Sequence, residues 1–99
     1  MTAYNKGYRL ELRLVKHLRE QGMRAHRTPG SKTPVDVWAG ADGHSFCFQV
    51  QIARYFPPAK LEALRDEAKQ FGAIPYIAWR DGKKLVIEEL RNEKKSSQP

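Results

Sequence analysis

Hydrophobic positions in the first quarter of the chain recur with the period of an α-helix. At about 100° per residue, five apolar side chains of residues 6–21 fall within one broad arc, and Gly22 marks the end of the segment. These apolar side chains are Tyr8, Leu12, Leu14, Val15 and Leu18. Glu11 lies near the middle of the arc, and the opposite side carries Arg9, Arg13, Lys16, His17 and Glu20. We therefore expect a helix that packs inward, turns a basic face outward and holds one acid on its inner side.

Other segments alternate between apolar and remaining residues with the two-residue period of β-strands. In residues 44–52 one side carries Phe46, Phe48, Val50 and Ile52, and the other side carries Ser45, Cys47, Gln49 and Gln51. Residues 35–39 indicate the preceding strand, and the turn formers at 40–43 join the two strands as a hairpin. Residues 23–28, 74–80 and 83–90 indicate three further strands.

A second helix is predicted for residues 58–71, with proline near its first turn and Gly72 after its end. The predicted order is therefore helix, three strands, helix and two strands. Because helices and strands interleave, we expect an α/β fold with a mixed central β-sheet flanked by helices. The length favours a single domain over residues 1–91, followed by a polar C-terminal tail at 92–99.

Positive charge is concentrated near the N-terminus. The chain has 18 Lys and Arg against 11 Asp and Glu, and its isoelectric point is near 9.8. Residues 5–32 alone account for a charge of +6 out of a net +7. Such a patch suits a polyanion, for which nucleic acid is the default partner. The alternative is a basic surface that serves only solubility.

Several classes of protein are excluded or disfavoured by composition. The single cysteine, Cys47, excludes an intrachain disulfide framework and a zinc site built from cysteines. No apolar run approaches the length of about 20 residues that a membrane span needs, and the N-terminus lacks the apolar core of a signal peptide. We expect a protein of the cytoplasm, or of the host cytoplasm if the chain is viral.

Two acids occupy positions where the pattern calls for apolar residues. A carboxylate such as Glu11 on the inner side of a helix is costly unless it is paired, protonated or bound to a metal. Asp36 interrupts an apolar strand, where aspartate is disfavoured. The structural alternatives are a pairing of Glu11 with Arg27 or Lys16, and a bracing role for Asp36 in its loop.

The hairpin brings Asp36 toward the two glutamines of the next strand. A loop of four residues at 40–43 would set Ala39 opposite His44 and Asp36 near Cys47. Gln49 would then lie one step along on the same face, and Gln51 one step further.

Several segments, taken in order, resemble the archaeal-type Holliday junction resolvases of the PD-(D/E)XK nuclease superfamily. The first segment is KGYRLELRLVKHLREQG, which looks like their first helix, with an opening Lys-Gly pair and a metal-linked glutamate. The others are HRTPGSKTPVDVWA, CFQVQ and FGAIPYIAWR, and the likeness runs from Lys6 to about Leu90. The resemblance implies a restriction-endonuclease-like fold, a homodimer, and DNA as partner, either a four-way junction or a branched duplex.

The resemblance also implies roles for individual residues. It carries the metal-linked glutamate onto Glu11 and the metal-ligand aspartate onto Asp36, with Gln49 and Gln51 at the catalytic acid and lysine positions. The metal ligands would be Asp36, Gln49 and Glu11. They would hold Mg²⁺ or Mn²⁺ if the site is active, and no cofactor if it is not. DNA would be contacted by Lys6, Arg9, Arg13, Arg27, Gly30, Ser31 and Lys32.

The two glutamines depart from the family pattern, since the acid becomes a neutral amide and the lysine loses its charge. A substitute cation would have to come from elsewhere, for example Lys32 or Arg54. Three functions therefore remain open. They are a metal-dependent endonuclease with a weakened site, a non-catalytic DNA-binding protein on the same scaffold, and a basic nucleic-acid-binding module of unrelated α/β fold.

Overall fold

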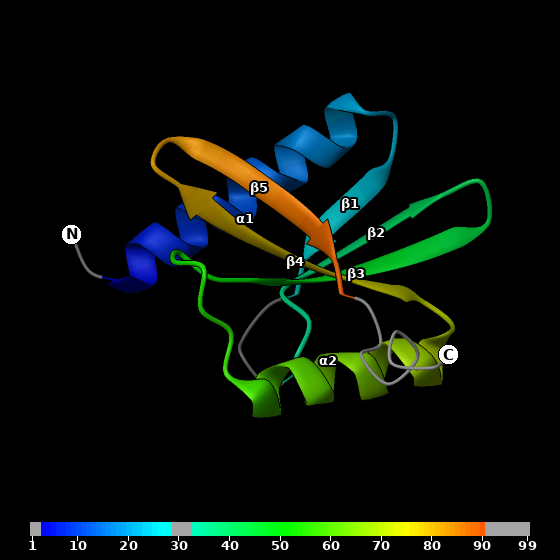
Figure 1. The fold of residues 1–99 in the computed structure, drawn as a ribbon. Coiled ribbons are helices and arrows are strands. Elements are labelled where there is room, and N and C mark those ends of the chain that lie inside the picture. The colour runs from blue at the N-terminus through cyan, green and yellow to red at the C-terminus, as the bar shows by residue number, and fades with distance from the viewer. Residues whose placement is uncertain (1–2, 29–32, 91–99) are drawn as a thin grey trace, which may run out of the picture.

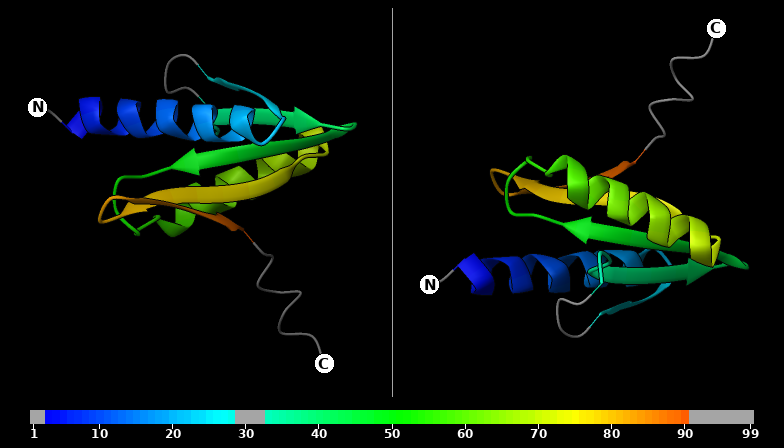
Figure 2. Two further views of the ribbon diagram at one scale, coloured as in Figure 1. Left: turned by 90° about the horizontal axis from the view of Figure 1, so that it is seen from above. Right: turned by 90° about the horizontal axis from the view of Figure 1, so that it is seen from below.

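Two helices cover opposite faces of one β-sheet. The computed structural model describes residues 3–28 and 33–90, so the predicted tail at 92–99 lies outside the described residues. Helix α1 spans Ala3–Glu20 and helix α2 spans Pro58–Phe71. Figure 1 and the two views of Figure 2 show the sheet between them. Neither of these helices is long and apolar enough to cross a membrane.

The sheet has five strands in the order of the chain. They are β1 (Arg24–Arg27), β2 (Val37–Ala41), β3 (His44–Val50), β4 (Ile74–Asp81) and β5 (Lys84–Glu89). Strands β3 and β4 are parallel, and the other neighbouring pairs are antiparallel. A parallel pair needs a crossover connection, which α2 supplies. The prediction of an α/β fold with a mixed sheet flanked by helices is confirmed.

The hairpin between β2 and β3 is tighter than the sequence pattern indicated. Its turn consists of Asp42 and Gly43, which both have positive φ angles, 52° and 80°. These values match the two-residue turn that follows the twist of a hairpin. Ala39 consequently faces Phe46 and not His44, so the predicted register is wrong by two residues. The correction moves Asp36 from the level of Cys47 to the level of Gln49.

Each face of the sheet has its own hydrophobic core. The core on the α1 side includes Leu10, Leu14, Val15, Leu18, Ala25, Val37, Ala39, Phe48, Val50 and Ala78. The core on the α2 side is smaller and includes Val35, Cys47, Leu64 and Ala68. Burial raises the pKa of the Cys47 thiol to about 11, with a further contribution from the Glu67 charge, so this thiol is protonated at neutral pH. Tyr8 and Leu12, expected on the inner face of α1, are 39% and 43% exposed.

Candidate active site

Asp36 and Gln49 form the centre of the candidate site. The backbone N–H of Asp36 donates to the Phe48 carbonyl at 2.8 Å, which sets Asp36 beside the end of β3. One carboxylate oxygen, Oδ2, then accepts two hydrogen bonds from β3. The Val50 backbone N–H donates to it at 2.8 Å, and Gln49 Nε2 donates at 3.0 Å. The carboxylate is therefore fixed by the strand end, and the proximity of Asp36 to Gln49 predicted from the sequence is present.

The amide of Gln49 is held in one orientation. Its Nε2 atom donates to the Pro34 carbonyl at 3.1 Å as well as to Asp36. With both N–H groups committed, the amide oxygen points elsewhere. Gln49 is only 5% exposed, and its Oε1 atom is buried with no hydrogen-bond donor among the described residues. A buried carbonyl oxygen without a donor is uncommon and costly, and this one belongs to a residue bonded to a carboxylate.

Glu11 forms an ion pair on the α1 side of the sheet. Arg27 Nε donates to Glu11 Oε1 at 2.9 Å, and the two side chains are 26% and 18% exposed. The same guanidinium lies over the ring of Tyr8, 4.4 Å from its centroid. Of the two pairings proposed from the sequence, Glu11 takes the one with Arg27. Arg27 is therefore held between an acid and an aromatic ring.

The pKa values of Glu11 and Asp36 depend on burial and on a shared positive charge, that of Arg27. Burial raises the pKa of Glu11, and the negative charge of Asp36 raises it further, whereas Arg27 opposes both effects. Burial also raises the pKa of Asp36. The hydrogen bonds from Val50 and Gln49 lower that pKa, followed by the positive charges of Lys60 and Arg27. Glu11 and Asp36 thus belong to one electrostatic neighbourhood, with Arg27 acting on each.

Gln51 follows the end of β3. Its backbone N–H donates to the Ala78 carbonyl at 3.0 Å, which continues the pairing with β4 by one residue. Because side chains alternate along a strand, Gln51 lies on the same face as Gln49. The predicted loop residues Gly30, Ser31 and Lys32 lie outside the described residues. The loop nevertheless starts next to the site, since the Thr28 backbone N–H donates to the Asp36 carbonyl at 2.9 Å.

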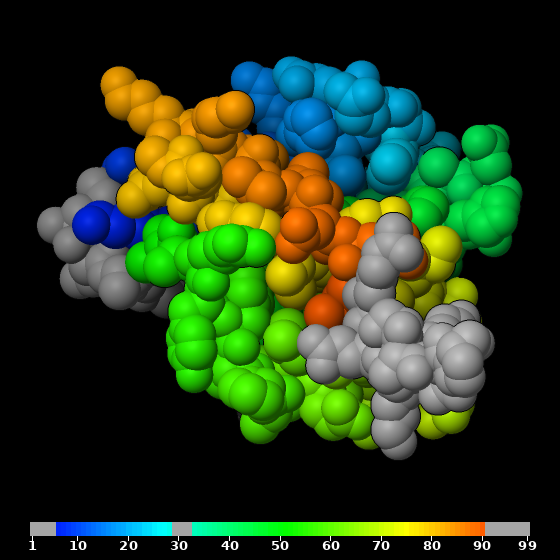
Figure 3. Space-filling view, in the orientation of Figure 1, coloured from blue at the N-terminus to red at the C-terminus, as the bar shows by residue number. Residues whose placement is uncertain are grey.

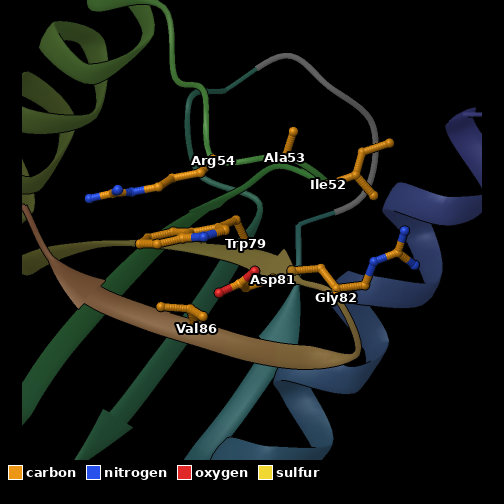
Figure 4. Close-up of a pocket in the computed structure, with 8 residues that line it drawn as sticks. Ile52, Ala53, Arg54, Trp79, Asp81, Gly82 and Val86 are labelled. Atoms are coloured by element: carbon orange, nitrogen blue, oxygen red, sulfur yellow. The ribbon is translucent and has the colours of Figure 1, made fainter.

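Arg54, one of the cations considered as a substitute for the missing lysine, is engaged elsewhere. Its guanidinium lies over the ring of Trp79, 5.3 Å from the centroid. The stacked pair lines an open cavity of about 580 Å³ formed by the chain after β3 and the end of β4 (Figure 4). Stacking of this kind holds a guanidinium by its attraction to the ring face. Arg54 therefore contributes its charge to this cavity.

The basic face of α1 extends onto the β4–β5 turn. Lys6, Arg9 and Arg13 are exposed, as the pattern predicted, and Arg13 Nη2 donates to the Lys83 carbonyl at 2.7 Å. Figure 3 shows the surface of β4 and β5 beside that of α1. The groove between them has a volume of about 460 Å³, and its basic lining residues are Arg13, Lys16, His17, Lys83 and Lys84. Sequence reasoning missed the two lysines because they lie about 70 residues from α1 along the chain.

The donor set around Asp36 is compatible with a single hard cation. A carboxylate and an unpaired amide oxygen are ligands that Mg²⁺ accepts, with water completing the shell. Within residues 3–28 and 33–90, however, no three His, Cys, Asp or Glu side chains gather into a metal site. Arg27 also offsets the charge of Glu11. The residues fit a weakly held cation on Asp36, and Gln49 Oε1 would join it only if the amide turned, because Nε2 is the atom that now faces Asp36.

Comparisons with known proteins agree with this fold. The sequence matches the family described as archaeal Holliday junction resolvase (Hjc) over residues 2–98. Among solved structures, the fold is similar to Archaeoglobus fulgidus Hjc, a Holliday junction resolvase from an archaeal hyperthermophile. The TM-score is 0.74 at 27% sequence identity, and the match covers 86% of this chain and 73% of the other. A search among curated proteins gives no match.

Proposed function

The chain belongs to the archaeal Holliday junction resolvase family, and on that premise we propose that it binds branched DNA and cleaves it in a Mg²⁺- or Mn²⁺-dependent reaction. The substrate in this proposal is a four-way junction, and the reacting phosphodiester lies at Asp36 and Gln49. The observation that carries the proposal is the buried Gln49 Oε1, which has no donor among the described residues and whose side chain is bonded to the Asp36 carboxylate.

In this proposal Asp36 is the charged metal ligand and Gln49 is the neutral one. Asp36 contributes the negative charge, and its position is fixed by the N–H groups of Val50 and Gln49. Gln49 contributes a neutral carbonyl oxygen that needs no deprotonation. A divalent ion bound there would polarise a phosphoryl oxygen and lower the pKa of its water. Glu11 adds negative charge nearby, and its pairing with Arg27 makes it the weaker ligand of the three.

The basic groove between α1 and the β4–β5 turn is our candidate for the DNA backbone. Lys6 and Arg9 lie on the same helix, and Arg13 joins the helix to the turn. Gly30, Ser31 and Lys32 remain proposed DNA contacts from the sequence; they follow Thr28, whose backbone N–H donates to the Asp36 carbonyl. A homodimer would set two such sites on the two strands of a junction, as closed two-fold symmetry allows.

A second candidate function is a non-catalytic binder of branched DNA on the same scaffold. It is favoured by the hydrogen bond from Gln49 Nε2 to Asp36, because this bond satisfies the carboxylate without a metal. The lack of charge at Gln51 favours it as well. In this alternative the basic groove keeps its role and the site does no chemistry.

One assay separates the two functions. The purified protein is incubated with a labelled four-way junction and with a linear duplex of the same sequence, with Mn²⁺, with Mg²⁺ or with neither. The endonuclease predicts paired symmetric nicks in the junction, which fall by at least about 100-fold in Asp36→Asn because a charged ligand is removed. Tight binding with no nicks under any condition would establish the binder.

Salt dependence provides a check that both functions share. Phosphate contacts release counterions, so the logarithm of the binding constant should fall linearly with the logarithm of the salt concentration. A double variant, Lys83→Gln with Lys84→Gln, should reduce that slope by about 1 to 2 if both lysines contact phosphates. An unchanged slope would remove the β4–β5 turn from the interface.

A further inference from the structure

Among residues 3–28 and 33–90, the site has two acids and an amide, and the positive charges considered so far are engaged with other groups. Gln51 is neutral, Arg27 is paired with Glu11, and Arg54 is stacked on Trp79. A phosphodiester that gains negative charge during cleavage is stabilised by a cation held close to it. The question is whether another element brings a cation to the end of β3.

The direction of α2 along the sheet shows that its first turn lies near the end of β3. Strands β3 and β4 are parallel and α2 connects them, so the helix runs back against the direction of β3, as Figure 2 shows. Two contacts fix its position along the sheet. Phe71, at the end of α2, meets Trp38 with the ring centroids 5.6 Å apart. Leu64, two turns earlier, packs with Val35 and Cys47. Moving toward the start of α2 thus means moving toward the start of β2 and the end of β3.

Lys60 continues this series by one turn. It precedes Leu64 by four residues, so it shares the helix face that packs on the sheet and lies about 6 Å further along the axis. On β3, the step from Cys47 to Gln49 covers a similar length, about 6.6 Å. Lys60 therefore stands at the level of Gln49 and Gln51, on the face where both glutamines lie. Its side chain is exposed, so its ammonium is accessible to a ligand.

We infer that Lys60 supplies, from the first turn of α2, the positive charge that Gln51 lacks on β3. The inference rests on the proposed function and adds to it the group that faces the phosphodiester. The electrostatics of the site agree with this placement, because the charge of Lys60 is among those that lower the pKa of Asp36. The ammonium of Lys60 would donate hydrogen bonds to a phosphate oxygen as negative charge develops there, and it keeps its own proton throughout.

The first test measures Mn²⁺ affinity in the absence of DNA. A cation near the metal repels it, so Lys60→Met should bind Mn²⁺ about 3- to 10-fold more tightly than the parent protein. Lys69→Met is the matched control, since Lys69 is exposed in the last turn of the same helix, and its affinity should equal that of the parent. Equal affinity in Lys60→Met and the parent would overturn the inference.

The second test measures cleavage of a four-way junction at saturating Mn²⁺. Lys60→Met should cut about 100-fold more slowly, as expected for the loss of one group that stabilises developing charge, with unchanged junction affinity. Lys60→Arg should keep part of the rate. Adding Gln51→Lys to Lys60→Met should restore cutting, because the charge returns from the strand. Full activity in Lys60→Met, or slow cutting without rescue by Gln51→Lys, would contradict the inference.

The inference and the proposed function fail differently. A parent protein that binds the junction but cuts it only after Gln51→Lys is introduced contradicts the role of Lys60 and leaves the site at Asp36 and Gln49 standing. A parent protein that binds neither Mn²⁺ nor the junction contradicts the proposed function itself, and Lys60 with it.

Discussion

Glu11 and Asp36 are both half-buried carboxylates, and they are satisfied in different ways. Glu11 receives a guanidinium, so Arg27 balances its charge at 2.9 Å. Among the described residues, the hydrogen-bond donors to the Asp36 carboxylate are two neutral N–H groups, from Val50 and Gln49. Burial raises the pKa of both acids. One pair is therefore close to electrically neutral, whereas the other keeps a full negative charge when Asp36 is ionised.

This difference indicates which acid is prepared for a ligand. A paired acid must release its partner before it can bind a cation, and the loss of a half-buried ion pair is costly. Within the described part of the chain, Asp36 has no ion pair to lose, and the amide beside it has an oxygen without a hydrogen-bond donor. In the proposed function, Asp36 and Gln49 are accordingly the main ligands, and Glu11, which is held by Arg27, is the weaker one.

The largest expected effect comes from replacing Gln49 by an acid, so that two carboxylates stand at the Asp36–Gln49 pair. Gln49→Glu would place a second carboxylate within 3.0 Å of Asp36, where Gln49 Nε2 now donates. Without metal, repulsion between the acids and the lost hydrogen bonds should lower the free energy of unfolding by about 2 to 3 kcal/mol at neutral pH. With a second charged ligand, Mn²⁺ affinity should rise by about 100-fold. Urea denaturation and calorimetric titration measure the two effects.

Gln70→Glu is the control for this change, because it adds the same charge at an exposed position on α2. It should alter neither stability nor Mn²⁺ affinity measurably. If Gln49→Glu left Mn²⁺ affinity unchanged, the amide position would not be a ligand position, and the contrast between the two carboxylates would lose its functional meaning.

The parts of this site that sequence could predict are those with local signals. Proline near the first turn and Gly72 after the last define α2, and its observed bounds, Pro58–Phe71, equal the predicted ones. The alternation of β3 set Gln49 and Gln51 on one face. The inward position of Glu11 in α1 followed from the helical period, and Arg27 was one of its two expected partners.

The remaining parts depend on contacts that the chain makes across long separations. The register of the β2–β3 hairpin was wrong because Asp42 adopts a positive φ, which non-glycine residues seldom do. The approach of Lys83 to Arg13 follows from the whole path of the sheet. Lys60 could be aligned with the site only after contacts of Leu64 and Phe71 had fixed how α2 lies on the sheet.

A smaller effect is expected from breaking the ion pair between Glu11 and Arg27. Arg27→Met leaves Glu11 half-buried without its cation, which should lower the free energy of unfolding by about 1 to 2 kcal/mol at neutral pH. The loss should shrink as pH falls toward the ordinary glutamate pKa of 4.5, because protonated Glu11 needs no counter-charge. Urea denaturation at both pH values measures it.

Two further variants sharpen this result. Arg24→Met, which removes an exposed arginine from the same strand, should change stability little. Combining Arg27→Met with Glu11→Gln should recover most of the lost stability. An effect of Arg27→Met that was independent of pH would mean that the packing on Tyr8, and not the ion pair, is what Arg27 contributes.

The smallest effect concerns the charge of Asp36 itself. Because its pKa is raised in the folded protein from 3.8, the native state binds this proton more tightly than the unfolded chain. The stability that the proton contributes is present at low pH and is lost as pH rises through the raised pKa. Asp36→Asn lacks this loss, and its amide oxygen can still accept from Val50. Its stability relative to the parent should therefore increase from acid to neutral pH, by about 1 kcal/mol or less.

Thermal denaturation of the parent protein, Asp36→Asn and the exposed control Asp66→Asn over this pH range measures the difference. Saturating Mn²⁺ should reverse the trend in the parent protein, since the metal binds ionised Asp36 and releases its proton. The same metal should leave Asp36→Asn unchanged. If the stability of the parent protein relative to Asp36→Asn showed no dependence on pH or on Mn²⁺, the Asp36 carboxylate would be fully compensated in the folded protein. The contrast with Glu11 would then no longer support different roles for the two acids.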